Sequence, residues 1–154
     1  MGEIKVRFKA SVKGKSIRGR ALVDGGSEDT LLNLNQACEL GLNVAHAKIV
    51  DREAVGGIKV HGYELSVTVE TEGKKARVRA FVPVARETEA GVREAFPRNE
   101  EPLIGQDFLQ RTANLNYKKD ALEGIGFRRW RRKKASAATV RFLRGHSFCR
   151  TPGR

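Results

Sequence analysis

The feature that most constrains the fold is an alternation of apolar and polar residues that recurs in four stretches of the chain. A period of two places every second side chain on one face, as in a β-strand with one buried side. A short polar turn that contains Gly14 connects the first two stretches, and one that contains Gly73 connects the last two. The pattern therefore predicts two long β-hairpins and a mostly β fold. The four stretches are 4–12, 16–23, 63–69 and 76–84.

Two short helices are expected between the strands. The segment 33–42 has Asn33 near its start, where an N-cap belongs, and Gly41 where a helix of this length ends. Its apolar residues fall on one helical face. A second short helix is expected to start after Gly105 and to bury Phe108.

The segment 86–101 interrupts the alternation with five glutamates and a proline. Such a composition predicts an exposed loop, with room for one helical turn. A last stretch with strand character, 115–122, predicts a closing hairpin.

The charge of the chain is concentrated at its C-terminal end. The formal net charge is +12, but residues 1–127 hold 20 Lys and Arg against 18 Asp and Glu, and residues 128–154 hold ten basic residues and no acid. We therefore expect a β domain at 1–127 and a basic tail at 128–154 that is disordered in the free state. The densest part of the tail is a candidate for nonspecific contact with polyanions or nucleic acid. It consists of Arg128, Arg129, Trp130, Arg131, Arg132, Lys133 and Lys134.

Several classes of protein are disfavoured. No apolar run approaches the roughly 18 residues that a membrane-spanning helix needs, so no membrane partner is expected. The N-terminus lacks a charged-then-apolar signal segment, and we expect a cytosolic protein. The two cysteines and three histidines lack the spacing of a metal site, so reduced thiols and no metal are expected.

One acid stands at the end of an apolar strand. The apolar run that ends at Val23 leads into Asp24, Gly25 and Gly26, and a second apolar run follows at Leu31. A buried carboxylate is costly unless it is hydrogen-bonded, and neighbouring glycines let backbone amides approach it closely. Such a position can hold an ionisable group for chemistry. The same residues also suit an ordinary Asp-Gly turn, and the segment alone does not separate the two interpretations.

Three segments, in order, resemble the retropepsin-like aspartic proteases, the family of retroviral proteases and their single-domain cellular and prokaryotic relatives. The segment 21–32, ALVDGGSEDTLL, looks like the catalytic loop of that family. The segment 55–60, VGGIKV, looks like its glycine-tipped flap hairpin. The segment 102–109, PLIGQDFL, resembles its apolar-apolar-Gly-x-[DN]-x-L motif, and 114–118 stands in the place of its closing strand. The resemblance spans residues 4–125.

The resemblance implies an all-β fold, a closed or partly open β-barrel with one or two short helices, that acts as a symmetric homodimer. Asp24 of each subunit would be catalytic, because one carboxylate cannot both activate water and protonate a leaving group. Two carboxylates held so close share one proton. The expected function is that of an aspartic endopeptidase that cleaves extended polypeptide without a metal or organic cofactor.

The resemblance also implies roles for other residues. Gly25, Gly26 and Ser27 would support the catalytic loop. The residues expected to bind substrate are Glu28, Asp29, Val55, Gly56, Gly57 and Ile58. The residues expected in the structural ψ-loop are Leu103, Ile104 and Gly105.

The sequence departs from the family pattern at two positions. Gly25 stands where the family has Thr or Ser, whose hydroxyl is expected to bond across the dimer. Its loss leaves buried partners unsatisfied, at about 1–3 kcal/mol for each group. Gln106 replaces the usual Arg, so a neutral hydrogen bond at most replaces a charged pairing with Glu28. Two alternatives therefore stand beside the endopeptidase: an inactive dimer that binds peptides in the same groove, and a nucleic-acid binder that acts through the tail.

Overall fold

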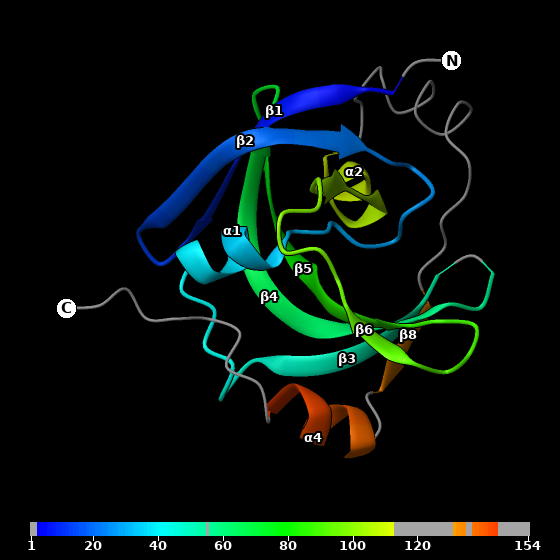
Figure 1. Cartoon of the computed structure of the whole chain (residues 1–154). Coiled ribbons are helices and arrows are strands. Elements are labelled where there is room, and N and C mark those ends of the chain that lie inside the picture. The colour runs from blue at the N-terminus through cyan, green and yellow to red at the C-terminus, as the bar shows by residue number, and fades with distance from the viewer. Residues whose placement is uncertain (1–2, 55, 113–130, 135–136, 145–154) are drawn as a thin grey trace.

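The computed structural model describes residues 3–54, 56–112, 131–134 and 137–144 (Figure 1). Its strands are β1 (Lys5–Val12), β2 (Lys15–Val23), β3 (Lys48–Glu53), β4 (Lys59–Thr71), β5 (Lys74–Glu87), β6 (Arg93–Ala95), β7 (Leu103–Ile104) and β8 (Arg131–Lys134). Its helices are α1 (Leu34–Glu39), α2 (Gln106–Arg111) and α4 (Ala137–Arg144).

The strands form one sheet in the order β6-β5-β4-β1-β2-β7. Strand β3 pairs with β4, and β8 pairs with the other edge of β3. The described strands leave this sheet unclosed, and the predicted mostly β fold is confirmed. No helix within the described ranges is long and apolar enough to cross a membrane.

Both predicted hairpins are present, with the predicted turns. Strand β1 pairs antiparallel with β2, and β4 pairs antiparallel with β5. At each turn the two central residues have positive φ, the primed-turn geometry that matches the twist of the flanking strands. These residues are Lys13 (45°), Gly14 (81°), Glu72 (50°) and Gly73 (73°).

The predicted first helix is present but shorter than expected. The Asn33 side chain accepts a hydrogen bond from the backbone of Gln36, and the Gln36 side chain accepts one from the backbone of Asn33, which forms a capping box. Gly41, with φ of 87°, donates to the carbonyl of Cys38, and Leu42 donates to Ala37. This is a Schellman motif, so the helix ends where a glycine permits the left-handed turn. The expected second helix is α2.

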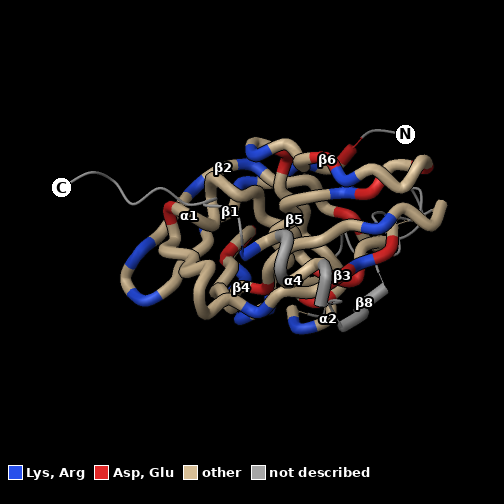
Figure 2. Tube along the Cα trace, turned by 60° about the horizontal axis from the view of Figure 1, so that its bottom comes forward, with Lys and Arg blue, Asp and Glu red and all other residues tan. Residues whose placement is uncertain are grey.

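The structure differs from the sequence-based expectations in four places. Strand β3 was not expected, and 93–95 forms the short strand β6 instead of a helical turn. Cys38 is disulfide-bonded, not a reduced thiol. Two parts of the basic tail, 131–134 and 137–144, form a strand and a helix that lie against the β3–β4 hairpin (Figure 1). Figure 2 shows Lys, Arg, Asp and Glu distributed over the other strands and loops. The predicted hairpin at 115–122 lies outside the described residues, as do Arg128, Arg129 and Trp130.

The smaller of two buried apolar groups positions the loop that follows β2. Leu31 exchanges two backbone hydrogen bonds with Leu103, of 2.8 and 3.0 Å, and also forms a bridge with Phe81. The loop is thereby held between β5 and β7. The group consists of Leu31, Val50, Val60, Phe81 and Leu103.

Candidate functional site

Asp24 lies where β2 leaves the sheet between β1 and β7. Leu22 and Val23 pair in parallel with Leu103 and Ile104, and the Asp24 N–H donates to the carbonyl of Ile104 over 3.0 Å. The Asp24 residue is 4% exposed. Because β2 ends at Val23, the side-chain carboxyl of Asp24 lies at the margin of the sheet and not in the middle of a hydrogen-bonded ladder.

The turn after Asp24 brings a backbone donor to its carboxylate. The Gly26 N–H donates to Oδ1 of Asp24 over 2.9 Å, and the Ser27 N–H donates to its main-chain carbonyl over 3.2 Å. The Ser27 hydroxyl donates to the carbonyl of Asp29 over 2.7 Å. A turn of this kind holds a largely buried carboxylate in a defined direction.

Helix α2 braces the same turn from the other side. The Gln106 side chain donates to the carbonyl of Gly25 over 2.6 Å, and its backbone N–H donates to Ser27 over 2.7 Å. The Gln106 side chain is thus the neutral replacement expected from the sequence, but its partner is Gly25 and not Glu28, which is exposed. A Cβ on Gly105 would lie 2.4 Å from the carbonyl oxygen of Asp29, so the helix approaches this closely only because residue 105 is glycine.

Asp107 joins α2 to the loop through Thr30. One carboxylate oxygen of Asp107 accepts bonds from the Thr30 N–H (3.0 Å), the Thr30 hydroxyl (2.7 Å) and the Phe108 N–H (2.7 Å). Its other oxygen is buried without a hydrogen-bond partner among the described residues. Burial raises the pKa of Asp107 above its ordinary value, and the bonds from Thr30 and Phe108 offset only part of that rise.

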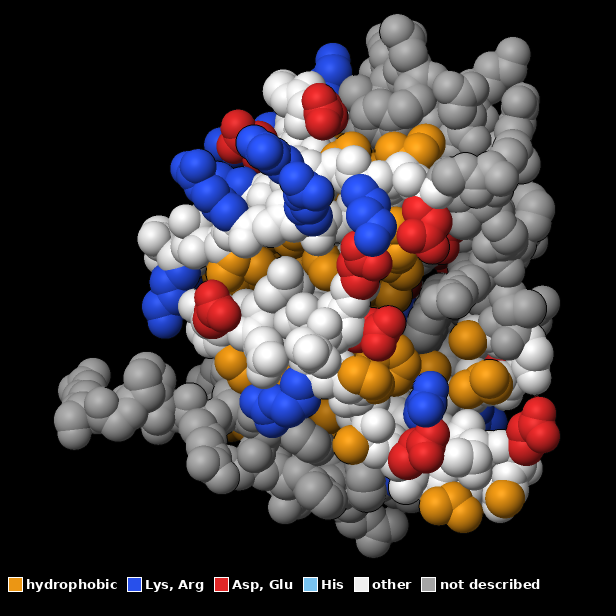
Figure 3. Space-filling model, turned by 45° about the horizontal axis from the view of Figure 1, so that its top comes forward, with side chains coloured by type: hydrophobic (Ala, Val, Ile, Leu, Met, Phe, Trp, Pro, Cys, Tyr) orange, Lys and Arg blue, Asp and Glu red, His pale blue; other side chains and the backbone are white. Residues whose placement is uncertain are grey.

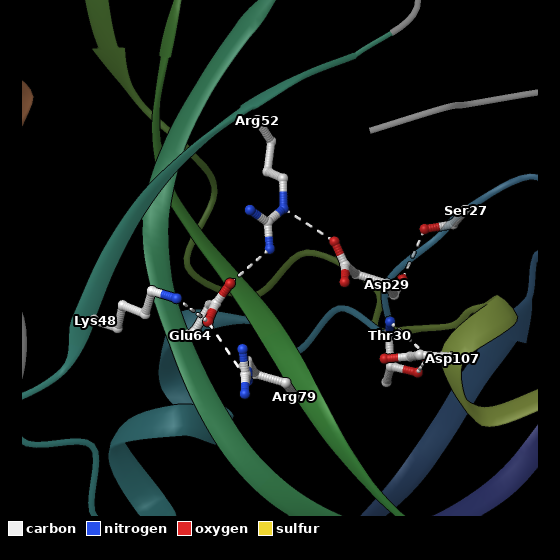
Figure 4. A network of polar contacts seen from close by, with 8 residues as sticks. All are labelled: Ser27, Asp29, Thr30, Lys48, Arg52, Glu64, Arg79 and Asp107. Carbon is white, nitrogen blue, oxygen red and sulfur yellow. Dashed lines mark hydrogen bonds and ion pairs between the residues drawn. The ribbon is translucent and has the colours of Figure 1, made fainter. Parts of the chain in front are cut away.

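A buried guanidinium connects the loop to the β3–β4 hairpin (Figure 4). Nε of Arg52 donates to Asp29 over 2.9 Å, and Nη2 donates to Glu64 over 3.0 Å. The side chains of Arg52 and Glu64 are 0% and 2% exposed. Lys48 and Arg79 lie farther from Glu64, at 3.6 and 3.7 Å. The loop after Asp24 and both strands of the β3–β4 hairpin therefore share one ion network.

The Arg52 guanidinium also lies over an aromatic ring. Its Cζ is 4.9 Å from the centre of the Phe81 ring, within the range of a cation–π contact. Nη1 of Arg52 is buried without a hydrogen-bond partner among the described residues. Neither Arg52 nor Glu64 is predictable from the sequence pattern, because three consecutive charged residues at 51–53 conceal the strand β3 that carries the arginine.

The glycine-tipped segment forms the end of the β3–β4 hairpin. Ala54 donates to Ile58 over 2.8 Å, and Gly57 donates to Ala54 over 3.1 Å. Gly56 and Gly57 have φ of 89° and 76°, which disfavours any residue with a Cβ. Ile58 is 41% exposed, and Val55 lies outside the described residues. Figure 1 shows this tip on the same side of the molecule as the loop after β2.

A buried histidine supports the base of that hairpin. The two ring nitrogens of His61 lie 2.7 Å from Asp51 and 3.1 Å from Glu87, so the imidazole stands between two carboxylates. Thr139 of α4 is 3.5 Å from the same ring. Burial raises the pKa of Glu87, but hydrogen bonds from Arg93 and His61 outweigh that effect and leave the pKa below its ordinary value.

No cluster of three or more candidate metal ligands occurs in the part of the chain that the structure describes. The described residues that are expected at the site lie in two loops that contain glycines and in the segment that leads into α2. The residues at 24–29 and 103–105 are brought into direct contact, and Arg52 ties the hairpin that ends at 56–58 to the former. Compared with known proteins, the sequence matches no family model, and no curated protein matches it either.

Replacement of Arg52 by Met should destabilise the fold by about 3–5 kcal/mol, because it removes the closest cation from the buried carboxylate of Glu64 and the half-buried carboxylate of Asp29. Urea unfolding measures the change. The matched control is Arg86→Met, since Arg86 makes an exposed ion pair with Glu94 whose loss should cost about 1 kcal/mol or less. Equal losses in the two variants would contradict the central role of the buried network.

Asp107→Asn should change how stability depends on pH. The folded state binds the Asp107 proton more tightly than the unfolded state, so this group lowers stability as pH rises from about 4 through its raised pKa. The variant lacks that loss, and its free energy of unfolding relative to wild type should increase with pH over this interval. Urea unfolding at several pH values measures it, with Glu28→Gln on the same loop as control. A pH-independent difference would refute the expectation.

Proposed function

We propose that this protein is a homodimeric aspartic endopeptidase that hydrolyses peptide bonds of extended polypeptide with water activated between two Asp24 carboxylates. The observation that supports this most directly is the placement of Asp24 in a buried glycine turn at the end of β2, with an amide bonded to its carboxylate. The parallel β2–β7 pair and the bracing by α2 give that carboxylate a fixed direction.

The chemistry requires a second carboxylate beside the first. One group must remove a proton from water while another donates a proton to the scissile carbonyl oxygen. Within the described turn, Asp24 is the acid whose carboxylate accepts a bond from a backbone amide. In the proposed dimer, a second copy of the chain supplies the second Asp24 across a two-fold axis. Two like charges at that distance cannot both ionise, so the pair holds one proton and titrates as a unit.

The hairpin that ends at Gly56 and Gly57 completes the proposed substrate groove. Glycines at this tip allow a peptide backbone to approach closely, and an extended peptide is held there by main-chain hydrogen bonds. The Arg52–Asp29 bond ties the base of the hairpin to the loop that carries Asp24. The proposed site therefore has a fixed floor and a hairpin anchored at its base.

Gly25 supports a second candidate, a dimer that binds peptides without cleaving them. The position has no hydroxyl to bond across the proposed interface, and in the structure its carbonyl is held by Gln106 within the same chain. A weaker interface would leave the two Asp24 carboxylates less well aligned, and misplaced catalytic groups lose much of their effect.

Asp24→Asn should abolish cleavage of an unstructured protein such as casein between pH 3 and 7. A loss of about 10²–10⁴-fold is expected for removal of a catalytic acid–base group. Wild-type activity per chain should rise with protein concentration, because the site needs two chains. Glu39→Gln on the exposed side of α1 is the control and should retain activity. Activity that survives Asp24→Asn would refute the proposal, and a silent dimer that still binds peptide would favour the second candidate.

Gly25→Thr should strengthen both the dimer and its activity. The added hydroxyl restores a donor at the proposed interface, worth about 1–3 kcal/mol for each buried partner that it satisfies. Analytical ultracentrifugation and the casein assay measure the two effects. Unchanged dimerisation and unchanged cleavage together would show that the missing hydroxyl does not limit this protein.

A further inference from the structure

A row of cations follows the outward face of the β1–β2 hairpin. Arg7, Arg18 and Arg20 are exposed and Lys9 is partly exposed, while the residues that alternate with them in β1 face the core. We call these four residues the β1–β2 basic stripe. It is separate from the basic tail and lies within the part of the chain that has almost no net charge.

The register places like charges directly opposite one another. Arg7 pairs with Arg20 and Lys9 pairs with Arg18 across the two strands. Directly opposed like charges destabilise an antiparallel pair. Within the described residues none of the four forms a salt bridge. Lys9 has Glu70 of β4 opposite it on its other side, whereas the register places no acid opposite Arg7 or Arg20. The hairpin therefore keeps a costly arrangement of charge at Arg7 and Arg20 that an external anion would relieve.

We propose that the β1–β2 basic stripe binds the sugar-phosphate backbone of single-stranded nucleic acid. Alternate residues of a strand are roughly 6.6–6.8 Å apart, so each strand presents cations at a regular interval on one face. The phosphates of an extended single strand recur at a comparable interval, and a positively charged groove that tracks them is the usual basis of such binding. The proposal does not depend on the proposed peptidase activity.

A groove beside the β1–β2 basic stripe could hold the single strand of nucleic acid in the proposed complex. It has a volume of about 640 Å³, and its lining includes the four cations together with Glu70 and Glu72. The cations outnumber the acids along the groove, and Arg7, Arg18 and Arg20 are exposed to an incoming polyanion. Phe8, which also lines the groove, is 5% exposed and packs in the core, so it is not placed to stack on a base. Binding should therefore be independent of base sequence.

The surface around the stripe favours nucleic acid over an anionic membrane. A membrane-binding face combines cations with exposed apolar side chains that enter the lipid. Among the described residues the exposed large hydrophobic ones are Ile58 and Val92, and neither lies on β1 or β2. Figure 3 views the side of the molecule where β1 and β2 lie and shows Lys and Arg side chains gathered on one part of it.

Fluorescence anisotropy with a labelled 20-nucleotide oligo(dT) and the full chain tests the proposal. Four phosphate contacts contribute about 3 to the slope of log affinity against log salt, at about 0.7 for each contact. The variant Arg7→Gln with Arg20→Gln should bind more weakly and should reduce that slope by about 1.4. The control, Lys59→Gln with Arg77→Gln, removes the same charge from exposed positions outside the stripe and should leave the slope unchanged.

Two results would overturn the proposal. The first is an equal loss of slope in the control, which would mean that net charge alone drives binding. The second is an unchanged oligo(dT) affinity in the Arg7 and Arg20 variant, with or without a stripe-dependent loss of binding to vesicles that contain phosphatidylserine. A loss for vesicles alone would assign the stripe to a membrane surface.

A stability measurement tests the same stripe independently of any ligand. Arg7→Glu places an acid opposite Arg20, so repulsion becomes attraction across the hairpin. The thermal midpoint should rise by about 1–4 °C while oligo(dT) affinity falls. A variant that gains stability and loses binding is expected where a surface retains strain for function. A lower midpoint in this variant would show that the opposed cations carry no cost and would remove that support.

Discussion

The buried guanidinium of Arg52 is the interaction on which the site depends. A guanidinium with no exposed surface is tolerated only when carboxylates meet it, and here Asp29 and Glu64 do so from two different elements. The ring of Phe81 supports it from a third. Without these carboxylates Arg52 would be an uncompensated buried charge, so its burial requires the loop after Asp24, strand β4 and the hairpin base to come together.

The fold was predictable from the sequence where a strand has one solvent-exposed face and one buried face. Both long hairpins alternate in sequence, and their turns need residues that accept positive φ, so pattern and turn agree. Strand β3 fails this test. Its charged residues Asp51 and Arg52 are bound by His61 and Asp29, and Arg52 is buried. The sequence of β3 therefore does not alternate between apolar and polar residues. A strand that buries a charged side chain in an ion pair is not predicted by a search for such alternation.

The loop at Asp24 was identifiable from the sequence because its chemistry is local. Glycines, an acid and a strand end lie within a few residues, and the structure bonds Gly26 to Asp24 directly. The contacts that fix this loop are not local. Gln106 and Asp107 reach it from about eighty residues away, and the clearance for their approach depends on the absence of a side chain at Gly105. A glycine whose role is close approach has no signal in a single sequence beyond its identity.

The distribution of charge in the domain explains why its outer surface is more basic than its formal charge. Acids are used as internal partners: Asp24, Glu64 and Asp107 bond to backbone or side chains inside the fold. Burial withdraws the carboxylates of Asp24 and Glu64 from the field that a ligand meets, and within the described ranges Arg52 is the one buried cation withdrawn with them. The cations of the β1–β2 basic stripe stay at the surface, and among the described residues none of them forms a salt bridge. The near-neutral sum over residues 1–127 therefore coexists with a row of exposed cations on β1 and β2, because exposed acids lie on other elements, and this local arrangement decides which ligands that face attracts.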